Sequence, residues 1–302
     1  ITTGNSNVAV GYLSLSANTT GASNVGIGVI ALDDNTTGSD NIGIGRSALG
    51  ANTTGANNVA VGSLALDANT TAADNTAVGY GSLSANTTGT RNTGIGRFAL
   101  TENTTASDNT SVGYGSLEKN TTGANNAALG KGALFANTTA SNNTAVGYAA
   151  LTANTTGASS TAVGKSAGAG NTTGKVDAFG AETLLSNTTG VSNAAFGATA
   201  LYSNTTGRYN TAFGAASSGI FGALFYNTTA DDNSAFGTQA LASTTTGAAN
   251  TGVGSGALFA NTTGAENTAV GKGALSANTT AANNVAVGKS ALVANTTGDY
   301  NT

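Results

Sequence analysis

The sequence has no cysteine, histidine, methionine, tryptophan or proline. Without cysteine the chain cannot build a disulfide framework, and without histidine or cysteine it lacks the commonest general base and the thiolate nucleophile of enzymes. Charged residues make up 8% of the 302 positions, against roughly 25% in an ordinary globular domain. The net charge of −4 gives no electrostatic reason for binding nucleic acid, and no apolar run approaches the roughly 20 residues of a membrane span.

What the chain does contain is a repeat, shown well by residues 143–157, NTAVGYAALTANTTG. Its Asn-Thr-Thr triplet recurs every seventeen positions from Asn18 to Asn171. The next triplet comes one position early, at Asn187, and a longer step of twenty-three positions leads from Asn204 to Asn227. Thr244 replaces asparagine in one later copy. Such a strict period in a chain of low charge predicts a solenoid.

The copies can be compared with one another position by position. One column is glycine in every copy from Gly11 to Gly288, which predicts a positive φ or a backbone contact too close for a Cβ atom. The column after the triplet is usually glycine but becomes alanine in some copies, as at Ala72 and Ala106. Because alanine disfavours positive φ, we expect an ordinary turn at that position.

Two apolar columns form the predicted core. A bulky residue precedes the fixed glycine, as Val146 does, and a leucine lies four positions after that glycine, as Leu151 does. Alternation before the glycine and frequent β-branched residues indicate two short strands in each copy. Seventeen residues are too few for a pair of helices. We therefore predict an all-β fold, a parallel β-solenoid (β-roll) of about 17 coils with about 17 residues per coil.

The regularity of the repeat suggests three regions within one continuous rod. Residues 1–174 and 234–302 are regular, whereas residues 175–233 are irregular and rich in phenylalanine, with an insertion near 217–222. The irregular region is either an imperfect copy that the fold tolerates or a dedicated contact with another subunit or a ligand. Because the sequence opens and closes within a repeat, we expect it to be a piece of a longer repetitive protein.

The motif Asn-Thr-Ala-Val-Gly-x-x-Ala-Leu at 143–151 resembles the head repeats of YadA-type trimeric autotransporter adhesins, where a Val-Ala-Ile-Gly-x-x-Ala-like motif recurs in a left-handed parallel β-roll. It is also similar to repeats of phage tail-fibre proteins that end in an intramolecular chaperone domain. The resemblance covers essentially the whole chain, although the adhesin repeats are shorter and lack Asn-Thr-Thr-Gly. It implies a parallel β-roll that is extracellular, on a cell surface or in a virion tail fibre.

Self-association follows from the small predicted core. Two large aliphatic side chains in each coil do not offset the entropy lost when a whole coil is ordered. Ladder hydrogen bonds and burial against other chains must supply the rest, so we predict a homo-oligomer, either a trimer or an end-to-end filament, because open coil ends leave unpaired strand edges.

The Asn-Thr-Thr triplet allows three hypotheses. Its side chains could stack in hydrogen-bond ladders, its threonines could form an ice-binding array, or its asparagines could be glycosylated, since Asn-x-Thr is an acceptor sequence. Against ice binding, adjacent threonines on a strand would point to opposite faces. The possible glycosylation sites are Asn18, Asn35, Asn52, Asn69, Asn86, Asn103, Asn120, Asn137, Asn154, Asn171, Asn187, Asn204, Asn227, Asn261, Asn278 and Asn295.

The column after the fixed glycine carries a possible surface-binding stripe. Aromatic and cationic residues alternate there, close enough for cation–π contact if the coils stack in register. The stripe is either an exposed ladder that stabilises neighbouring coils or a linear surface for glycans or a sister chain. Its members are Tyr80, Arg97, Tyr114, Lys131, Tyr148 and Lys165.

Taken together, the sequence predicts a structural, extracellular fibre or stalk protein, used for adhesion or as a filament, that is not an enzyme and needs no cofactor. The alternatives are a receptor- or glycan-binding tail fibre or adhesin head, and an ice-binding protein. Carboxylates such as Asp33 and Asp34, or Asp231 and Asp232, lack the spacing of a known metal-binding loop, so we expect no metal site.

Overall fold

A computed structural model describes residues 3–216 and 220–302, and within them the only regular elements are short strands and turns. The chain divides into two compact units, Ile1–Val146 and Gly147–Thr302. The first contains β1 (Val8–Val10), β2 (Val25–Ile27), β3 (Ile42–Ile44), β4 (Val59–Val61), β5 (Thr76–Val78), β6 (Thr93–Ile95), β7 (Thr110–Val112), β8 (Ala127–Leu129) and β9 (Thr144–Val146). The second contains β10 (Thr161–Val163), β11 (Val176–Phe179), β12 (Asn193–Phe196), β13 (Thr211–Phe213), β14 (Ser234–Phe236), β15 (Thr251–Val253), β16 (Thr268–Val270) and β17 (Val285–Val287).

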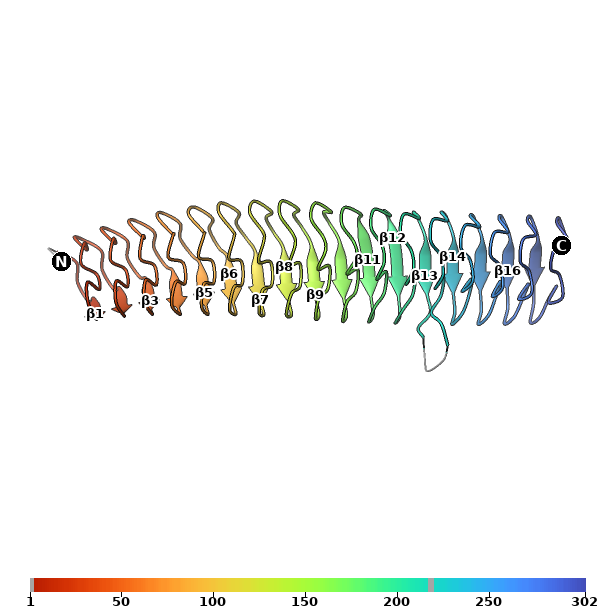
Figure 1. Ribbon diagram of the computed structural model, residues 1–302, viewed down its shortest axis with the longest axis horizontal. Coiled ribbons are helices and arrows are strands. Elements are labelled where there is room, and N and C mark those ends of the chain that lie inside the picture. Colours follow the sequence, from red (N-terminus) through yellow and green to blue (C-terminus); the bar gives the residue numbers. More distant parts are fainter. Residues whose placement is uncertain (1–2, 217–219) are drawn as a thin grey trace. The chain divides into compact units, whose positions relative to one another are not determined.

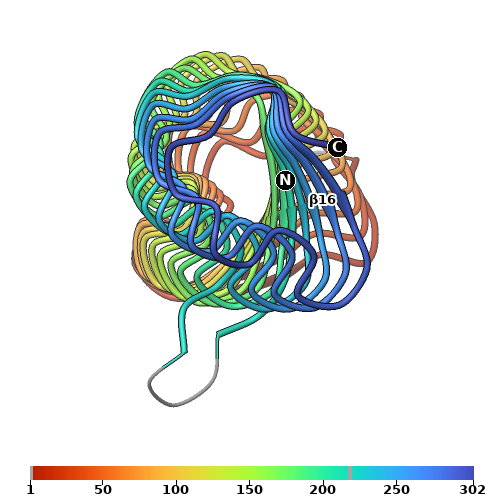
Figure 2. The same cartoon turned by 90° about the vertical axis from the view of Figure 1, so that its right-hand side faces the viewer.

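Within each unit the strands pair in parallel, and equivalent residues of successive copies lie opposite one another. Thr93 is opposite Thr110 in the first unit, for example, and Thr251 is opposite Thr268 in the second. Figure 1 shows that each coil contributes one strand to the stack, and Figure 2 shows successive coils of a unit overlying one another around a common interior. The prediction of a parallel β-solenoid is therefore confirmed, and bonded residues of successive coils are 17 residues apart in the regular copies.

The second strand expected in each coil does not form in the described residues. The leucine of that segment adopts a left-handed backbone conformation instead, with φ of 51° at Leu32 and 48° at Leu117. Its amide still donates to the next coil, as Leu49 does to the carbonyl oxygen of Ala65 at 3.0 Å. Left-handed backbone costs about 1–2 kcal/mol for a residue with a Cβ atom. The residue types of this segment favour a strand, but the coil can close only if the backbone turns sharply at this leucine.

The core differs from the prediction in one of its two columns. The leucines are buried as expected, and Leu32 and Leu134 have no exposed surface. The bulky residue before the fixed glycine, however, faces outward, with 36% of Ile44 exposed. The residue just before the bulky one is small in every strand, and from β2 to β17 it faces inward and is buried, like Ala60. The interior is too crowded for more, because a Cβ atom at Gly43 in the same column would lie 3.2 Å from Cγ of Leu32.

Asparagines of the Asn-Thr-Thr triplet form a buried ladder, which confirms the hydrogen-bond ladder hypothesis. Asn52 donates from Nδ2 to Oδ1 of Asn35 in the preceding coil at 2.8 Å and to the carbonyl oxygen of Gly55 in its own coil at 3.0 Å. The same two bonds recur at Asn120. Both amide hydrogens are thereby used, as a buried side-chain amide requires.

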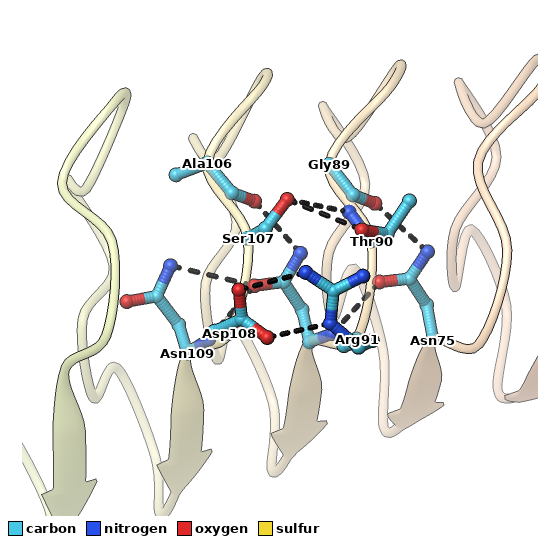
Figure 3. A network of polar contacts seen from close by, with 9 residues as sticks. Asn75, Gly89, Thr90, Arg91, Ala106, Ser107, Asp108 and Asn109 are labelled. Atoms are coloured by element: carbon cyan, nitrogen blue, oxygen red, sulfur yellow. Dashed lines mark hydrogen bonds and ion pairs between the residues drawn. The ribbon is translucent and has the colours of Figure 1, made fainter.

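A second buried asparagine ladder lies just before the strands (Figure 3). Asn75 donates from Nδ2 to the carbonyl oxygen of Gly89 at 2.9 Å, and its Oδ1 accepts the backbone N–H of Asn92 at 2.9 Å. Asn92 and Asn109 continue the pattern. Because these side chains bond to the backbone of the following coil, the ladder positions the start of the strands that follow its asparagines.

The fixed glycines have the positive φ that their column predicts. Their φ lies between 113° and 138° in every copy except Gly214, and a Cβ atom at Gly113 would lie 2.6 Å from the carbonyl oxygen of Gly130. The column after the triplet has no glycine or alanine with positive φ among the described residues, so the expectation of an ordinary turn there is also confirmed.

In the irregular copies of the second unit, the changes in length lie outside the strands. The copy that is one residue short omits one residue just before β11, and Val176 takes the place of a ladder asparagine opposite Asn193. The longest copy keeps Thr211 opposite Ser234 although 23 residues separate them. The described chain leaves the outline of the coil after β13 (Figure 1). The predicted insertion near 217–222 lies partly outside the described residues, which exclude 217–219.

The predicted regions 1–174, 175–233 and 234–302 stay a prediction, because the compact units divide elsewhere.

Thr244 offers a test of the triplet ladder, because this threonine replaces one of the asparagines and interrupts the ladder. Among the described residues, Oγ1 of Thr244 and Oδ1 of Asn227 are buried without a hydrogen-bond partner. The substitution Thr244→Asn should restore both ladder contacts and raise the free energy of unfolding by about 1–3 kcal/mol, the cost of a buried unsatisfied polar group. Denaturant unfolding measures this. Thr246→Asn, at an exposed position of the same turn, is the control and should change little. An unchanged stability for Thr244→Asn would contradict the assigned role of the ladder.

Alanine substitutions at two glycines compare a backbone conformation that is nearly forbidden to alanine with one that alanine can adopt at small cost. Gly113→Ala should lower the free energy of unfolding by about 2–3 kcal/mol, because its φ of 136° is nearly forbidden to alanine. Gly132 has a φ of 66°, and a Cβ atom added to it would meet no described heavy atom within 4 Å. Gly132→Ala should therefore cost less than about 1 kcal/mol, since the lower entropy of the unfolded chain offsets part of the strain. Equal losses in thermal unfolding would refute the distinction.

Candidate interaction surface

The outward face of the strands is the most distinctive surface of each unit. From β2 to β17 the next-to-last residue of each strand is buried, while the last residue and the residue two positions before it point away from the interior. The last residue of each strand, which precedes the fixed glycine, is valine, isoleucine, leucine or phenylalanine in every copy. Exposed fractions in this column include 39% at Ile95, 50% at Leu129 and 37% at Val270. Each unit thus carries a continuous row of large apolar side chains that the described part of the chain leaves uncovered.

This outward strand face also lacks charge. The first residue of each strand is mostly threonine or valine, as at Thr76 and Val59. Of the charged residues in the sequence, Asp177 is the one that falls in the two outward columns of the described strands. Charged side chains keep soluble surfaces from associating, and they are placed elsewhere on the coil. The face therefore combines exposed apolar area with the composition of an interface core.

Four successive strands of the second unit carry phenylalanine in the outward apolar row. The rings of Phe179 and Phe196 stack with centroids 4.7 Å apart and planes 5° apart, and those of Phe196 and Phe213 with centroids 4.3 Å apart. Phe213 and Phe236 stack at 5.3 Å. Despite this stacking, 40% of Phe213 and 42% of Phe236 remain exposed. We call these four residues the Phe block.

The predicted aromatic and cationic stripe is exposed, and its contacts agree with the expected cation–π pairing. In the first unit the Arg97 guanidinium lies 5.7 Å from the ring centroid of Tyr80 and 4.6 Å from that of Phe98, and Nζ of Lys131 lies 5.7 Å from that of Tyr114. The tyrosine rings stay accessible, with 45% of Tyr80 and 49% of Tyr114 exposed.

The stripe members in the second unit behave differently from one another. Tyr148 is 55% exposed. Lys165 forms an ion pair with Glu182, with Nζ 3.3 Å from Oε1. A salt bridge between exposed side chains contributes little stability, so this pair adds little to the stacking of the neighbouring coils.

A second exposed ion pair links neighbouring coils of the first unit (Figure 3). Arg91 donates to both carboxylate oxygens of Asp108, at 2.7 and 2.9 Å. The hydrogen bond from Arg91, and then its charge, hold the pKa of Asp108 below its usual value. The pair lies in the turn that precedes the strand and not on the outward strand face, so it aligns coils without charging that face.

The possible glycosylation sites, except the half-buried Asn295, are buried inside the coil. Asn35, Asn120 and Asn278 have no exposed surface, and their Nδ2 atoms donate hydrogen bonds within the ladder. Attaching a sugar to Nδ2 would remove one donor hydrogen and require the side chain to leave the interior. The geometry therefore favours the ladder over N-linked glycans for a folded coil, and glycosylation stays a prediction.

The two threonines of the triplet have different environments. The first is partly buried and bonds to the next coil, as Oγ1 of Thr53 does to the carbonyl oxygen of Thr70 at 3.0 Å. The second, such as Thr54, is exposed. An ice-binding face needs matched ranks of accessible hydroxyl and methyl groups, whereas here the hydroxyls of one rank are engaged with backbone. The ice-binding hypothesis gains no support from this arrangement.

Acidic side chains are dispersed over the coils. Among the described residues no three Asp or Glu side chains gather into a group that could hold a metal ion. Burial raises the pKa of Asp67, against the opposing effect of backbone hydrogen bonds to its carboxylate. Oδ1 of Asp67 has no hydrogen-bond partner in the part of the chain that the structure describes. The charge of Arg46 also opposes the rise in the pKa of Asp67.

Comparison with protein-family models gives no match, and comparison with curated proteins gives no significant similarity. The resemblance of the repeat to adhesin heads and tail fibres therefore remains an interpretation of the motif. Over the described ranges, no helix is long and apolar enough to cross a membrane.

Sequence reasoning missed the outward strand face because it placed the bulky column in the core. A signal was present in the neighbouring column. The middle residue of the strand never exceeds serine in size among the described copies, as at Ser111, whereas the bulky column admits four phenylalanines in succession. A packed interior of constant width would not accept that increase in volume, so the bulky column had to face outward.

Proposed function

We propose that the protein is a structural fibre protein whose chains associate side by side through the outward strand face. The observation that carries this proposal is the row of exposed apolar residues that runs through all the strands of each unit. In the two outward columns of the described strands, the one charged residue is Asp177. Exposed apolar patches of several hundred Å² often mark interaction sites. A second copy of the chain would cover it.

The area of the face suits self-association. Strands spaced about 4.8 Å apart give the nine strands of the first unit a length of about 40 Å, and two outward columns are about 10 Å wide. Each unit thus offers about 400 Å² to a partner, about half of the roughly 800 Å² per partner of a standard interface. Burial of this surface would also supplement the small leucine and alanine core.

The proposed role is mechanical. Backbone and asparagine ladders extend a coil stack from a short repeated unit, and the outward strand face joins stacks laterally. The scattered carboxylates and the lack of histidine and cysteine support a role without catalysis. An extracellular, cell-surface or tail-fibre location, and a part in adhesion, belong to this proposal through the resemblance of the repeat.

Charges placed on the outward strand face should separate the chains. The double variant Val78→Lys and Val112→Lys should convert the oligomer to monomer, because each lysine would have to be buried against an apolar surface. The same two lysines at the exposed positions Thr88 and Thr122, away from the strands, form the control and should leave the mass unchanged. Light scattering after size exclusion gives the mass, and circular dichroism reports folding. A wild-type chain that is monomeric at high micromolar concentration would refute the proposal.

A second candidate function is glycan binding along the aromatic and cationic stripe. The exposed rings of Tyr80 and Tyr114, each with a cation beside it, favour it, since aromatic rings with one accessible face can pack against the apolar face of a sugar.

The stripe can be tested separately from self-association. The double variant Tyr114→Ala and Tyr148→Ala should weaken binding to a glycan array at least about tenfold, the loss expected when two stacking contacts of about 1 kcal/mol are removed. Tyr209 is 56% exposed but lies outside the stripe, so Tyr209→Ala is the matched control. An array that shows no binding by the wild type would leave the stripe with its stabilising role alone.

A further inference from the structure

A uniform repeat leaves the alignment of neighbouring chains undefined. The outward apolar row reads Val61, Val78, Ile95 and Val112 along one stretch of the first unit. If one chain slides along another by a single coil, about 4.8 Å, almost every such contact is replaced by an equivalent one. Strand faces without distinguishing side chains specify register weakly.

The Phe block is where this face stops being uniform. Its four rings are in register from coil to coil and nearly parallel, with interplanar angles of 5°, 9° and 11°. The residues two positions further along these coils are small, and they stand where most of the regular copies carry tyrosine, lysine or arginine. They are Ala181, Ala198, Ala215 and Thr238.

We propose that the Phe block is a register key, a contact surface at which the Phe blocks of two copies of this chain pack against each other and thereby fix their axial alignment. The inference rests on the proposed self-association and adds to it the position at which the chains are matched. The occupant of the surface is a second copy of the same four residues and not a ligand.

Packing explains why the block would select one alignment. A Phe ring placed opposite a row made for valine is overpacked, and a valine opposite a row made for phenylalanine leaves a cavity, and both are unfavourable. The small residues beside the block leave room for rings of a partner, whereas Tyr148 and Lys165 fill that column in the two preceding coils. The large exposed fractions of Phe213 and Phe236 also require a cover, since side chains of this size are usually buried.

The test compares the wild-type chain with a variant in which Phe179, Phe196, Phe213 and Phe236 are all replaced by valine, the residue of the regular copies. Light scattering gives the mass of each assembly, and cryo-electron microscopy gives the axial offset between its chains. We expect one alignment in the wild type, with the Phe blocks in contact. In the variant the mass should persist, while alignments shifted by one coil in either direction become equally populated and the share of the original falls about threefold.

Phe225→Val is the matched control. Phe225 stacks on Tyr202, with ring centroids 4.9 Å apart, but lies outside the strands. This control should keep the single alignment, which would show that the effect belongs to the outward strand face and not to the number of stacked aromatic pairs. Thermal unfolding of all three proteins verifies that the variants fold.

The possible outcomes distinguish a failure of the register key from a failure of the proposed function. A wild-type assembly joined through the strand face with its Phe blocks apart would overturn the register key and leave the proposed function intact. A valine variant that keeps the single wild-type alignment would do the same. A monomer, or an assembly joined through another surface, would overturn the proposed function and the register key together.

Discussion

The in-register asparagine ladders are the interaction on which the rest of the structure depends. A side-chain amide buried in a small apolar interior is stable only when its donors and acceptor are paired, and here the partners of Asn52 are Oδ1 of Asn35 and a carbonyl oxygen of its own turn. That pairing requires the same residue at the same height in the next coil. The constant period is therefore a physical requirement, and length changes are confined to segments outside the ladders and strands, as before β11 and after β13.

Small side chains inside and large ones outside follow from the narrow coil. The chain turns sharply at core leucines with left-handed φ, such as Leu117 and Leu49. This unfavourable backbone is retained because these side chains are fully buried and their amides are paired with the next coil, as Leu49 is with Ala65. Alanine fills the remaining interior next to the leucine. The β-branched residues that stabilise the strands then have no place inside, so they lie on the outward face, where the exposed apolar surface needs a partner.

The period, the fold class and the glycine column could be predicted from sequence, because each depends on repetition and on excluded volume at Gly113 and its equivalents. Two features could not. The alternation in Thr144, Ala145 and Val146 allows either face of the strand to point inward, and apolar size suggested the wrong one. The turn at Leu151, with a φ of 50°, contradicts the preference of leucine for right-handed backbone, and it appears only when the closure of the whole coil is considered.

Periodicity has opposite consequences within a chain and between chains. Inside one chain, covalent connection brings each coil to the next in order, so identical ladders reinforce a single register. Between chains no such connection exists, and identical coils make neighbouring registers nearly equal in free energy. A repeat protein that assembles laterally therefore needs a stretch that is regular enough to continue its ladders and different enough on its outer face to be recognised. The coils from Phe179 to Phe236 meet both conditions, since their strands keep the pairing of the regular copies while their outward residues change in volume.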